Sequence, residues 1–445
     1  MNKGEYWNPV LETLPQEKLR QLQLKKFQEI VTWAYDHSKF YHQLYADAGL
    51  EPGDIKTFDD IRKVPKMEKS MMRDVQGPGK DNFPYGDILC VPLEQVTDYR
   101  QTSGTTGQPV YQADTWQDWE YGTEAYCYAL YAQGYRASDR IFLPFGYNIF
   151  IAFWAYHYAG EKLGCEVIPG GVLNTEARIL KMQELRATAM GATPTYVLGM
   201  AETARKMGLN PPTDLCIRKI TVAGEPGGSI PATRKRMEDA WGAKVYDQVG
   251  STEIGHWGWE CRQQAGLHVN EALYLIEIED VNTGECIDRP GKRGKMVVTT
   301  FNRLAQPCIR FDVKDLIEWN PEPCACGRTF RLLLGGIKGR ADDITKVKGV
   351  LLSPTAIEEV VRDIPQLSNE YLVVVTKKGD IDDITLKVEL LPKFQKDEAS
   401  VRSVLTDQLR VKTNLGYNIE FHPYESLPRS QAKSRRFQDQ RPKLH

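Results

Sequence analysis

The first apolar stretch of the chain repeats at the spacing of a helix. Apolar residues recur at roughly helical spacing, at Leu19, Leu22, Phe27, Ile30, Val31 and Ala34. This spacing predicts an amphipathic helix. From about residue 138 to 250, short apolar runs such as RIFLPF, CEVIPG, RKITVAG and KVYDQVG alternate with helix-like segments such as TEARILKMQELRATA and IPATRKRMEDAWG. Strands that alternate with helices predict βαβ units and a largely parallel sheet.

The rest of the chain has a different pattern. After residue 270, two strand-like runs, LYLIEIED and KMVVTTF, flank a turn at NTGE. Further on, SPTAIEEVV predicts a helix with Ser353 as its N-cap and Pro354 in its first turn. A hairpin around Lys378 and Gly379 and a helix at EASVRSVLTDQL follow. We expect an α/β fold: a large N-terminal domain of mixed sheets and helices, residues 1–340, and a small α+β domain, residues 341–445.

One apolar segment is long enough to span a bilayer. Residues 141–160, IFLPFGYNIFIAFWAYHYAG, carry no formal charge. The segment nevertheless contains a proline, a glycine, an asparagine, a histidine and three tyrosines, and no other part of the chain resembles it. We therefore expect a buried strand, turn and helix, and no membrane association.

Composition narrows the class of protein. With 41% hydrophobic and 26% charged residues, the chain has the make-up of a soluble globular protein. Its formal net charge of −2 gives no electrostatic basis for binding nucleic acid or an anionic membrane. The nine cysteines have no even spacing and no secretory leader precedes MNKGEYWNPV, so we expect a cytoplasmic protein with reduced thiols.

The segment QTSGTTGQPV, residues 101–110, combines four hydroxyl side chains with two glycines. Glycine lets an anion approach the backbone N–H groups, and hydroxyls add donors without bulk, which suits phosphate oxygens. The segment is not a Walker A loop, because only two residues separate Gly104 from Gly107 and Gln108 stands where a lysine would be expected. Taken alone, a solvated loop is the alternative interpretation.

Five further segments follow this loop in the chain: AGEPGG (223–228), VGSTE (249–253), RFDVKDL (310–316), GRADDITKVKG (339–349) and LPRSQAKSRR (427–436). In this order they resemble the signature segments of the adenylate-forming, acyl-CoA synthetase-like enzymes. FYHQLYADAG, HYAGEKLG, TPTYVLGMAE and CACGRT make the phenylacetate–CoA ligase family the best match. The resemblance extends from about residue 15 to residue 440.

The resemblance implies an AMP-forming ligase. Such an enzyme joins an aromatic acid, phenylacetate-like or indoleacetate-like, to ATP, giving an acyl-adenylate and pyrophosphate, and coenzyme A then displaces AMP. It implies ATP, Mg²⁺ and CoA as ligands and a homodimer as the expected assembly.

The resemblance also assigns the nucleotide site. The β- and γ-phosphates would be held by Thr102, Ser103, Gly104, Thr105, Thr106 and Gly107. The adenine side would be formed by Gly224, Glu225 and Pro226, together with Asp247, Val249, Gly250 and Ser251. Asp315 would accept hydrogen bonds from the ribose hydroxyls, with Arg340 nearby.

Three residues would act in catalysis. Lys433 would bridge the substrate carboxylate and the α-phosphate, Glu253 would help to hold Mg²⁺, and Thr252 would donate to the α-phosphate. Because Lys433 would have to leave before CoA enters, the small domain would rotate about a hinge at Asp342. Lys348 and Gly349 would then lie near CoA.

Two positions depart from the family pattern. Val249 stands where the family usually has a tyrosine that stacks on adenine, and Gln108 replaces a common lysine. The first change removes the ring that would stack on adenine and so affects adenine affinity. The second change removes a cation near the phosphates.

Four residues could hold zinc. Cys324 and Cys326 flank one residue before a glycine, and CRQQAGLH supplies Cys261 and His268. A Cys₃His set is suited to a closed, structural zinc site, although the CxC spacing is short and buried free cysteines are common.

The acid would lie against the aromatic turn PFGYNIFIAFW. Phe145, Tyr147 and Phe150 are the expected contacts, with Gly227 opening room for a larger ring. Aromatic residues at helical spacing can equally be ordinary core.

Two alternatives remain. One is an adenylating enzyme with another acceptor: an amine, a carrier protein, or a coenzyme that is itself adenylated. The other is a non-catalytic acyl or nucleotide sensor on the same fold, which the retained Lys433, Asp315 and Glu253 disfavour. A zinc-dependent nucleic-acid binder is disfavoured by the absence of a basic stripe.

Overall fold

The computed structural model describes most of the chain: residues 4–102, 108–149, 151–301, 303–341, 345–348, 350–378, 381–429 and 436–441. Several predicted site residues lie outside these ranges: Ser103, Gly104, Thr105, Thr106, Gly107, Phe150, Asp342, Gly349 and Lys433.

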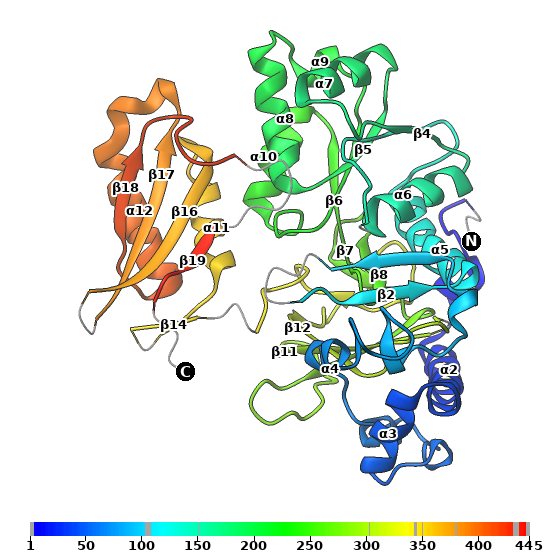
Figure 1. Cartoon of the computed structure of the whole chain (residues 1–445). Coiled ribbons are helices and arrows are strands. Elements are labelled where there is room, and N and C mark those ends of the chain that lie inside the picture. The colour runs from blue at the N-terminus through cyan, green and yellow to red at the C-terminus, as the bar shows by residue number, and fades with distance from the viewer. Residues whose placement is uncertain are drawn as a thin grey trace. The chain divides into compact units, whose positions relative to one another are not determined.

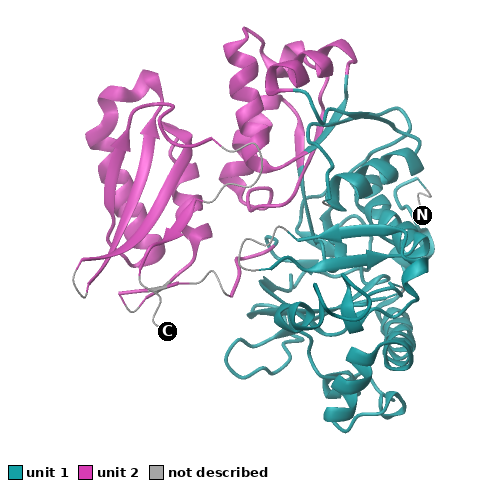
Figure 2. Ribbon diagram, in the orientation of Figure 1, with its two compact units in different colours: residues 1–173, 187–191, 246–336 teal, residues 174–186, 192–245, 337–445 magenta. Residues whose placement is uncertain are grey.

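The chain divides into two compact units (Figure 2). The first comprises residues 1–173, 187–191 and 246–336, and the second comprises residues 174–186, 192–245 and 337–445. The second unit therefore packs the segment 192–245 with the C-terminal part of the chain. These units group residues that pack together, and they do not test the expected domain boundary near residue 340. That boundary stays a prediction.

The helices of the first unit begin with the amphipathic helix that the sequence predicts. Its helices are α1 (Pro9–Glu12), α2 (Gln16–His37), α3 (Lys39–Asp47), α4 (Lys69–Val75), α5 (Trp116–Ala132) and α6 (Ile151–Lys162). In α2, Leu19, Phe27 and Ile30 are buried with Val31 and Ala34, so the predicted apolar face is the one that faces the core. Figure 1 shows α2 beside the antiparallel strands of the same unit.

The strands of the first unit belong to three sheets. They are β1 (Asp98–Gln101), β2 (Tyr111–Asp114), β3 (Arg140–Leu143), β4 (Glu166–Pro169), β5 (Ala189–Ala192), β7 (Lys244–Ser251), β8 (Gly255–Glu260), β9 (Leu267–Val269), β10 (Tyr274–Glu279), β11 (Arg293–Thr300), β12 (Phe311–Glu318) and β13 (Leu332–Leu333). Strand β3 pairs in parallel with β4 and β5, as the alternation of strands and helices predicts. The other pairs are antiparallel: β1 with β2, β7 through β8 and β9 to β13, and β10 with β11 and β12. Strands β7, β8, β9 and β13 belong to the same eight-stranded sheet as β3, β4 and β5.

The second unit holds a small mixed sheet. Its elements are α7 (Thr175–Glu184), α8 (Pro194–Lys206), α9 (Pro211–Asp214), β6 (Lys219–Val222), α10 (Pro231–Trp241), β14 (Thr345–Val347), β15 (Val350–Leu352), α11 (Pro354–Asp363), β16 (Leu367–Lys378), β17 (Ile381–Leu390), α12 (Glu398–Thr413), β18 (Asn418–His422) and β19 (Phe437–Asp439). The predicted hairpin is the antiparallel pair β16–β17, and β19 and β18 add in parallel to its two edges. Helices α11 and α12 share one apolar core with this sheet.

The apolar segment 141–160 forms the predicted strand and helix. Most of it lies in β3 and in α6, and α6 is only 12 residues long. Among the described residues, no helix is both long and apolar enough to cross a membrane.

Ser353 lies at the N-cap of α11, as predicted, but its hydroxyl does not cap the helix. Its Oγ lies 2.7 Å from the Oγ1 of Thr355 instead of accepting from a backbone N–H. Pro354 in the first turn already removes one of the unpaired N–H groups of the helix, so the cap is less needed.

Gly86 fixes the end of α4, the helix that carries Lys69. Its φ is +74°, and a Cβ at this position would lie 1.7 Å from the carbonyl oxygen of Val75. We expect Gly86→Ala to lower the free energy of unfolding by about 2 kcal/mol or more, because both the backbone conformation and the contact exclude a side chain. Urea unfolding followed by tryptophan fluorescence would measure this loss.

Gly53→Ala is the matched control. A Cβ at Gly53 meets no atom within 4 Å. Equal stability losses in the two variants would show that the contact with Val75 is relieved at little cost.

Candidate active site

The phosphate-loop segment is held closed at its base. Strands β1 and β2 run antiparallel on either side of it, from Asp98 opposite Asp114 to Gln101 opposite Tyr111. The next pair completes the ladder: the N–H of Thr102 donates to the carbonyl oxygen of Val110, and the N–H of Val110 donates to Thr102 Oγ1, both at 3.0 Å. Thr102 is buried, and its hydroxyl oxygen is therefore used to close the loop.

The β7–β8 hairpin carries the next motif. Asp247, Val249, Gly250 and Ser251 lie on β7, and Thr252 and Glu253 form the turn to β8. The pairing shifts register between Val249 and Gly250, and a Cβ at Gly250 would lie 2.7 Å from the carbonyl oxygen of Gly255. Gly250 is thus required for a tight hairpin.

Glu253 is buried and paired with a lysine that sequence reasoning missed. Its Oε1 lies 2.6 Å from the Nζ of Lys69, the first residue of α4. Burial acts to raise the pKa of the Glu253 carboxyl, but the charge of Lys69 and its hydrogen bond outweigh burial, and the pKa is lowered. Glu253 is therefore an ionised carboxylate. A lysine at the start of a short helix gives no sequence signal for this partnership.

The main chain at Glu253 is fixed by Arg303. The Arg303 Nη1 donates to the carbonyl oxygen of Glu253 at 2.8 Å, and the same guanidinium donates to both carboxylate oxygens of Asp114 at 2.8 and 2.9 Å. Arg303 and Asp114 are both buried. Burial raises the pKa of Asp114 to about 6, although Arg303 acts in the opposite direction. Because Asp114 ends β2, this ion pair joins the phosphate-loop hairpin to the Glu253 turn.

The ribose motif lies on the antiparallel sheet. Asp315 is half-buried on β12. Its neighbour Asp312 is held by Lys295 at 2.7 Å and by Lys314 at 3.0 Å. The preceding Arg310 makes buried ion pairs with Glu277 and Glu279, each at 3.0 Å. The strand that presents Asp315 is thus anchored by ion pairs at Asp312 and at the preceding Arg310.

The other three predicted adenine-side residues lie in the second unit, after β6. Gly224 has a φ of +92°, and Glu225 and Pro226 follow it. The Glu225 carboxylate accepts from the N–H of Thr195 at 2.7 Å. Gly227 has a φ of +149°, and a Cβ there would lie 2.6 Å from Pro194, so this glycine is needed for packing against the start of α8.

The structure also describes two predicted site residues of the segment GRADDITKVKG (339–349). Arg340 is half-buried, and Lys348 is exposed with a φ of +49°. The N–H of Lys348 donates to Asp382 at 3.0 Å.

The aromatic turn packs largely on itself. Phe145 stacks on Phe153 with ring centroids 4.7 Å apart, and the Tyr147 hydroxyl lies 2.8 Å from Nδ1 of His157. Both Phe145 and Tyr147 are partly exposed, so they can still contact a ligand.

His256 is a buried residue that sequence reasoning missed. It lies on β8, three residues after Glu253, with its ring 4.2 Å from that of Tyr126. Neither ring nitrogen makes a hydrogen bond of ordinary geometry. Burial lowers the pKa of His256 to about 3, with a small opposing effect of the Ala125 carbonyl, so the ring is neutral.

The predicted cysteine and histidine set comes together in the first unit. The ligand atoms of Cys261, His268, Cys324 and Cys326 all lie within 4.8 Å of one another. The sulfurs of Cys261 and Cys324 are 3.6 Å apart, and Cys326 Sγ is 3.4 Å from His268 Nε2. Bond lengths to tetrahedral zinc are roughly 2.3 Å from sulfur and 2.05 Å from nitrogen. They would place two sulfur ligands about 3.8 Å apart, and a sulfur and a nitrogen ligand about 3.6 Å apart.

The surroundings of this cluster also suit a metal. The other ring nitrogen, Nδ1 of His268, lies 3.2 Å from the carbonyl oxygen of Phe330, which leaves Nε2 to act as a ligand. Hydrogen bonds from Cys261 and Cys324 lower the pKa of the Cys326 thiol, so the cluster supplies a thiolate. The Tyr6 hydroxyl donates to the Cys326 carbonyl at 2.9 Å.

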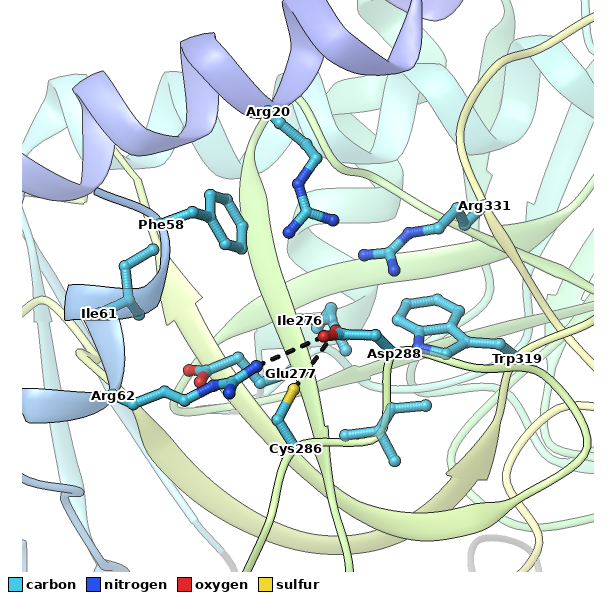
Figure 3. A pocket seen from close by; sticks show the side chains of 11 residues that line it. Arg20, Phe58, Ile61, Arg62, Ile276, Glu277, Cys286, Asp288, Trp319 and Arg331 are labelled. Carbon is cyan, nitrogen blue, oxygen red and sulfur yellow. Dashed lines mark hydrogen bonds and ion pairs between the residues drawn. The ribbon is translucent and has the colours of Figure 1, made fainter.

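A separate pocket lies between α2 and the β10–β12 sheet (Figure 3). Arg20, Phe58, Arg331 and Trp319 surround it, and Arg62 and Cys286 both contact Asp288. Its volume is about 20 Å³, roughly that needed by one water molecule. It contains none of the predicted site residues.

Comparison with known proteins identifies the family of the chain. Residues 349–441 match the family model of the AMP-binding enzyme C-terminal domain. Phenylacetate-coenzyme A ligase of Thermus thermophilus is 32% identical over 457 residues, covering 98% of this chain and 99% of the relative. The enzyme of the same name from Aromatoleum evansii is 32% identical over 447 residues, covering 97% of each.

Solved structures agree as well. A crystal structure of 2-hydroxyisobutyryl-CoA ligase in the postadenylation state, in complex with R3-HIB-AMP, matches with a TM-score of 0.92 and 26% identity. The match covers 98% of this chain and 93% of that one. The expected fold class is confirmed, and the protein is an AMP-forming acid–CoA ligase that uses ATP and CoA and proceeds through an acyl-adenylate. Within that class, the chain belongs to the phenylacetate–CoA ligase family.

The Arg303–Asp114 ion pair gives the first test of the site. We expect Arg303→Met to lower the free energy of unfolding by about 3–5 kcal/mol, because it leaves the Asp114 carboxylate buried without a partner. Chemical denaturation would measure the loss.

A double-mutant cycle provides the control. In Arg303→Met/Asp114→Asn both charges are removed, so we expect the double variant to be more stable than the sum of the single losses implies. Strictly additive losses would contradict a direct ion pair between the two side chains.

Proposed function

We propose that the carboxylic acid activated by this protein is aromatic, of the phenylacetate or indoleacetate type. The observation that carries this proposal is the 32% identity, over nearly the whole chain, to curated relatives named phenylacetate-coenzyme A ligase. The stacked rings of Phe145 and Phe153, beside Tyr147, supply an apolar aromatic surface on which a planar acid can lie.

A short hydroxy acid is the second candidate. It is favoured by the solved structure with a TM-score of 0.92, whose name specifies a 2-hydroxyisobutyryl substrate. The lower sequence identity of that relative, 26%, makes it the weaker of the two.

The chemistry requires two anions to meet. A carboxylate oxygen forms a bond to the α-phosphorus of ATP while the bond from that phosphorus to pyrophosphate breaks. We assign neutralisation of the developing charge to Lys433, hydrogen bonding of the α-phosphate to Thr252, and retention of the pyrophosphate to the loop from Thr102 to Gly107. Asp315 and Arg340 are assigned to the ribose, and the segments at Gly224 and Val249 to adenine.

Glu253 is assigned to Mg²⁺. A buried, ionised carboxylate is a suitable ligand for this hard cation, which otherwise takes phosphate oxygens and water. In the structure Lys69 supplies the positive charge beside Glu253. When bound, Mg²⁺ would neutralise phosphate charge.

The second half-reaction needs a different arrangement. The CoA sulfur attacks the acyl carbon of the adenylate, and AMP leaves. We assign the hinge to Asp342 and the CoA-facing surface to Lys348 and Gly349, as the family resemblance implies.

We propose that Cys261, His268, Cys324 and Cys326 hold a structural zinc ion. The distances between ligand atoms and the contact of His268 Nδ1 with a carbonyl oxygen support this assignment. All four positions would be filled by protein, so the site is closed and has no catalytic role.

Substrate choice is tested with ATP–pyrophosphate exchange. We expect exchange with arylacetates or indoleacetate to exceed that with 2-hydroxyisobutyrate and acetate by at least about tenfold in kcat/KM, a free-energy difference of about 1.4 kcal/mol in transition-state binding. Release of AMP with and without CoA would then identify the acceptor.

Other results of the exchange assay would change the proposed substrate or acceptor. Preferred exchange with 2-hydroxyisobutyrate would replace the aromatic proposal with the second candidate. Exchange that is not followed by CoA-dependent AMP release would favour an amine, a carrier protein or a coenzyme as the acceptor. Absence of exchange with every acid would contradict both candidates.

Zinc content is tested by elemental analysis. We expect about one zinc ion per chain in the wild type and less than about a tenth of that in Cys326→Ser, because three ligands hold zinc far more weakly than four. The melting temperature should fall in parallel. Cys216→Ser, which alters a thiol outside the cluster, is the control. A wild-type protein without zinc after reconstitution would refute the site.

A further inference from the structure

We propose that Arg436 is a positioning residue for the first half-reaction: it ties the tail that carries Lys433 to the adenine-side turn, through Thr195 and Glu225. The proposal rests on the assignment of Lys433 above. It predicts that this tie serves adenylation and is not needed for thioester formation.

The main chain at Arg436 is part of the small sheet. Its carbonyl oxygen accepts from the N–H of Val373 at 2.7 Å. The following residues, Phe437–Asp439, form β19 and pair in parallel with β16. Lys433 is three residues before this anchor in the sequence, and three residues of chain span at most about 11 Å. Where Arg436 is held therefore limits where Lys433 can reach.

The Arg436 side chain contacts two parts of the second unit. Its Nη2 lies 3.1 Å from Oε2 of Glu370 on β16, and its Nη1 donates to Oγ1 of Thr195 at 3.0 Å. The side chain is 12% exposed, and its guanidinium lies 5.2 Å from the ring centroid of Tyr371. The bond to Glu370 and a longer one from Nη2 to the carbonyl oxygen of Asn369, at 3.5 Å, stay within the small sheet, whereas the bond to Thr195 reaches the first turn of α8.

Thr195 links Arg436 to the nucleotide motif. It is buried at the N-terminus of α8, where backbone N–H groups have no partner inside the helix. Its N–H donates to Glu225 at 2.7 Å, and Glu225 belongs to the AGEPGG motif. The Thr195 residue therefore bonds Glu225 with its main chain and Arg436 with its side chain.

The Arg436–Thr195 bond holds only the tail. Other contacts hold the rest of the C-terminal part of the chain against the segment 192–245. Arg236 on α10 donates to the carbonyl oxygens of Arg362 and Ile364, at 2.9 and 2.6 Å, at the end of α11. Asn369 also donates to Glu202 on α8. Loss of the Thr195 hydroxyl would leave these contacts in place and would free only the tail.

Rotation of the small domain would break only one of the hydrogen bonds of the Arg436 side chain, the bond to Thr195. The bond to Glu370 and the β19–β16 pairing lie within the small sheet and would move with it. The bond to Thr195 would be lost. Arg436 would therefore hold the tail during adenylation, when Lys433 is needed. It would be released from Thr195 before thioester formation, when Lys433 is not needed.

The two half-reactions separate this role from a purely structural one. We expect Thr195→Val and Arg436→Lys to lower kcat for ATP–pyrophosphate exchange by about tenfold or more, the effect of losing a hydrogen bond to a charged group. The KM for ATP should change little. Thioester formation from chemically prepared acyl-adenylate and CoA should stay within about twofold of the wild-type rate, a difference of under about 0.5 kcal/mol.

Arg441→Lys is the matched control. Arg441 lies in the same tail and bonds Asp439 and Asp382 of the small sheet. It should retain both half-reactions. Equal losses in both half-reactions for Thr195→Val and Arg436→Lys, or unchanged exchange, would overturn the proposal.

A second measurement does not depend on the substrate. Amide hydrogen exchange in a peptide covering residues 428–436 should be faster in Thr195→Val than in the wild type and unchanged in Arg441→Lys. Equal exchange in Thr195→Val and the wild type would overturn the proposal even if no substrate were known. Lys433→Ala tests the underlying assignment separately: normal adenylation in that variant would refute the role of Lys433 instead.

Discussion

The buried guanidinium of Arg303 holds the first unit's part of the site together. It bonds both oxygens of Asp114 at the end of the phosphate-loop hairpin and the main chain of Glu253 in the next motif. A buried cation is costly unless its donors are satisfied, and these acceptors satisfy three of them. The requirement to pair this one charge therefore holds two sequence motifs, more than 100 residues apart, in a fixed relation.

Charge pairing recurs at the other anchored positions. Lys69 neutralises Glu253, and Arg310 pairs with Glu277 and Glu279 under the strand that carries Asp315. Buried carboxylates are expensive in the absence of a partner, so each pair restricts the main chain to one arrangement. Fixed main-chain positions of this kind suit the electrostatic role proposed for Glu253, because preorganised charges need not rearrange during the reaction.

Under the proposed mechanism, the tail of the second unit has to be held for adenylation and then released. Within this unit, the contacts of the C-terminal part of the chain with the segment 192–245 include hydrogen bonds to main-chain and hydroxyl oxygens, as at Arg236 and Arg436. Such bonds have fixed geometry but modest net free energy, because water can replace either partner. A surface of this kind is suited to repeated docking.

The sequence alone determined the order of the elements, the α/β class and the candidate residues. Periodic apolar positions specify α2, the β16–β17 hairpin and the helix of segment 141–160, because burial of one face depends on local spacing. The motif order likewise led to the ligase family, and it marked Cys261, His268, Cys324 and Cys326 as one set. Only the tertiary structure revealed Lys69 beside Glu253, the unpartnered ring of His256, and the link from Arg436 to Glu225. These depend on which residues distant in sequence become neighbours, and a single lysine, histidine or arginine carries no periodicity from which a partner can be inferred.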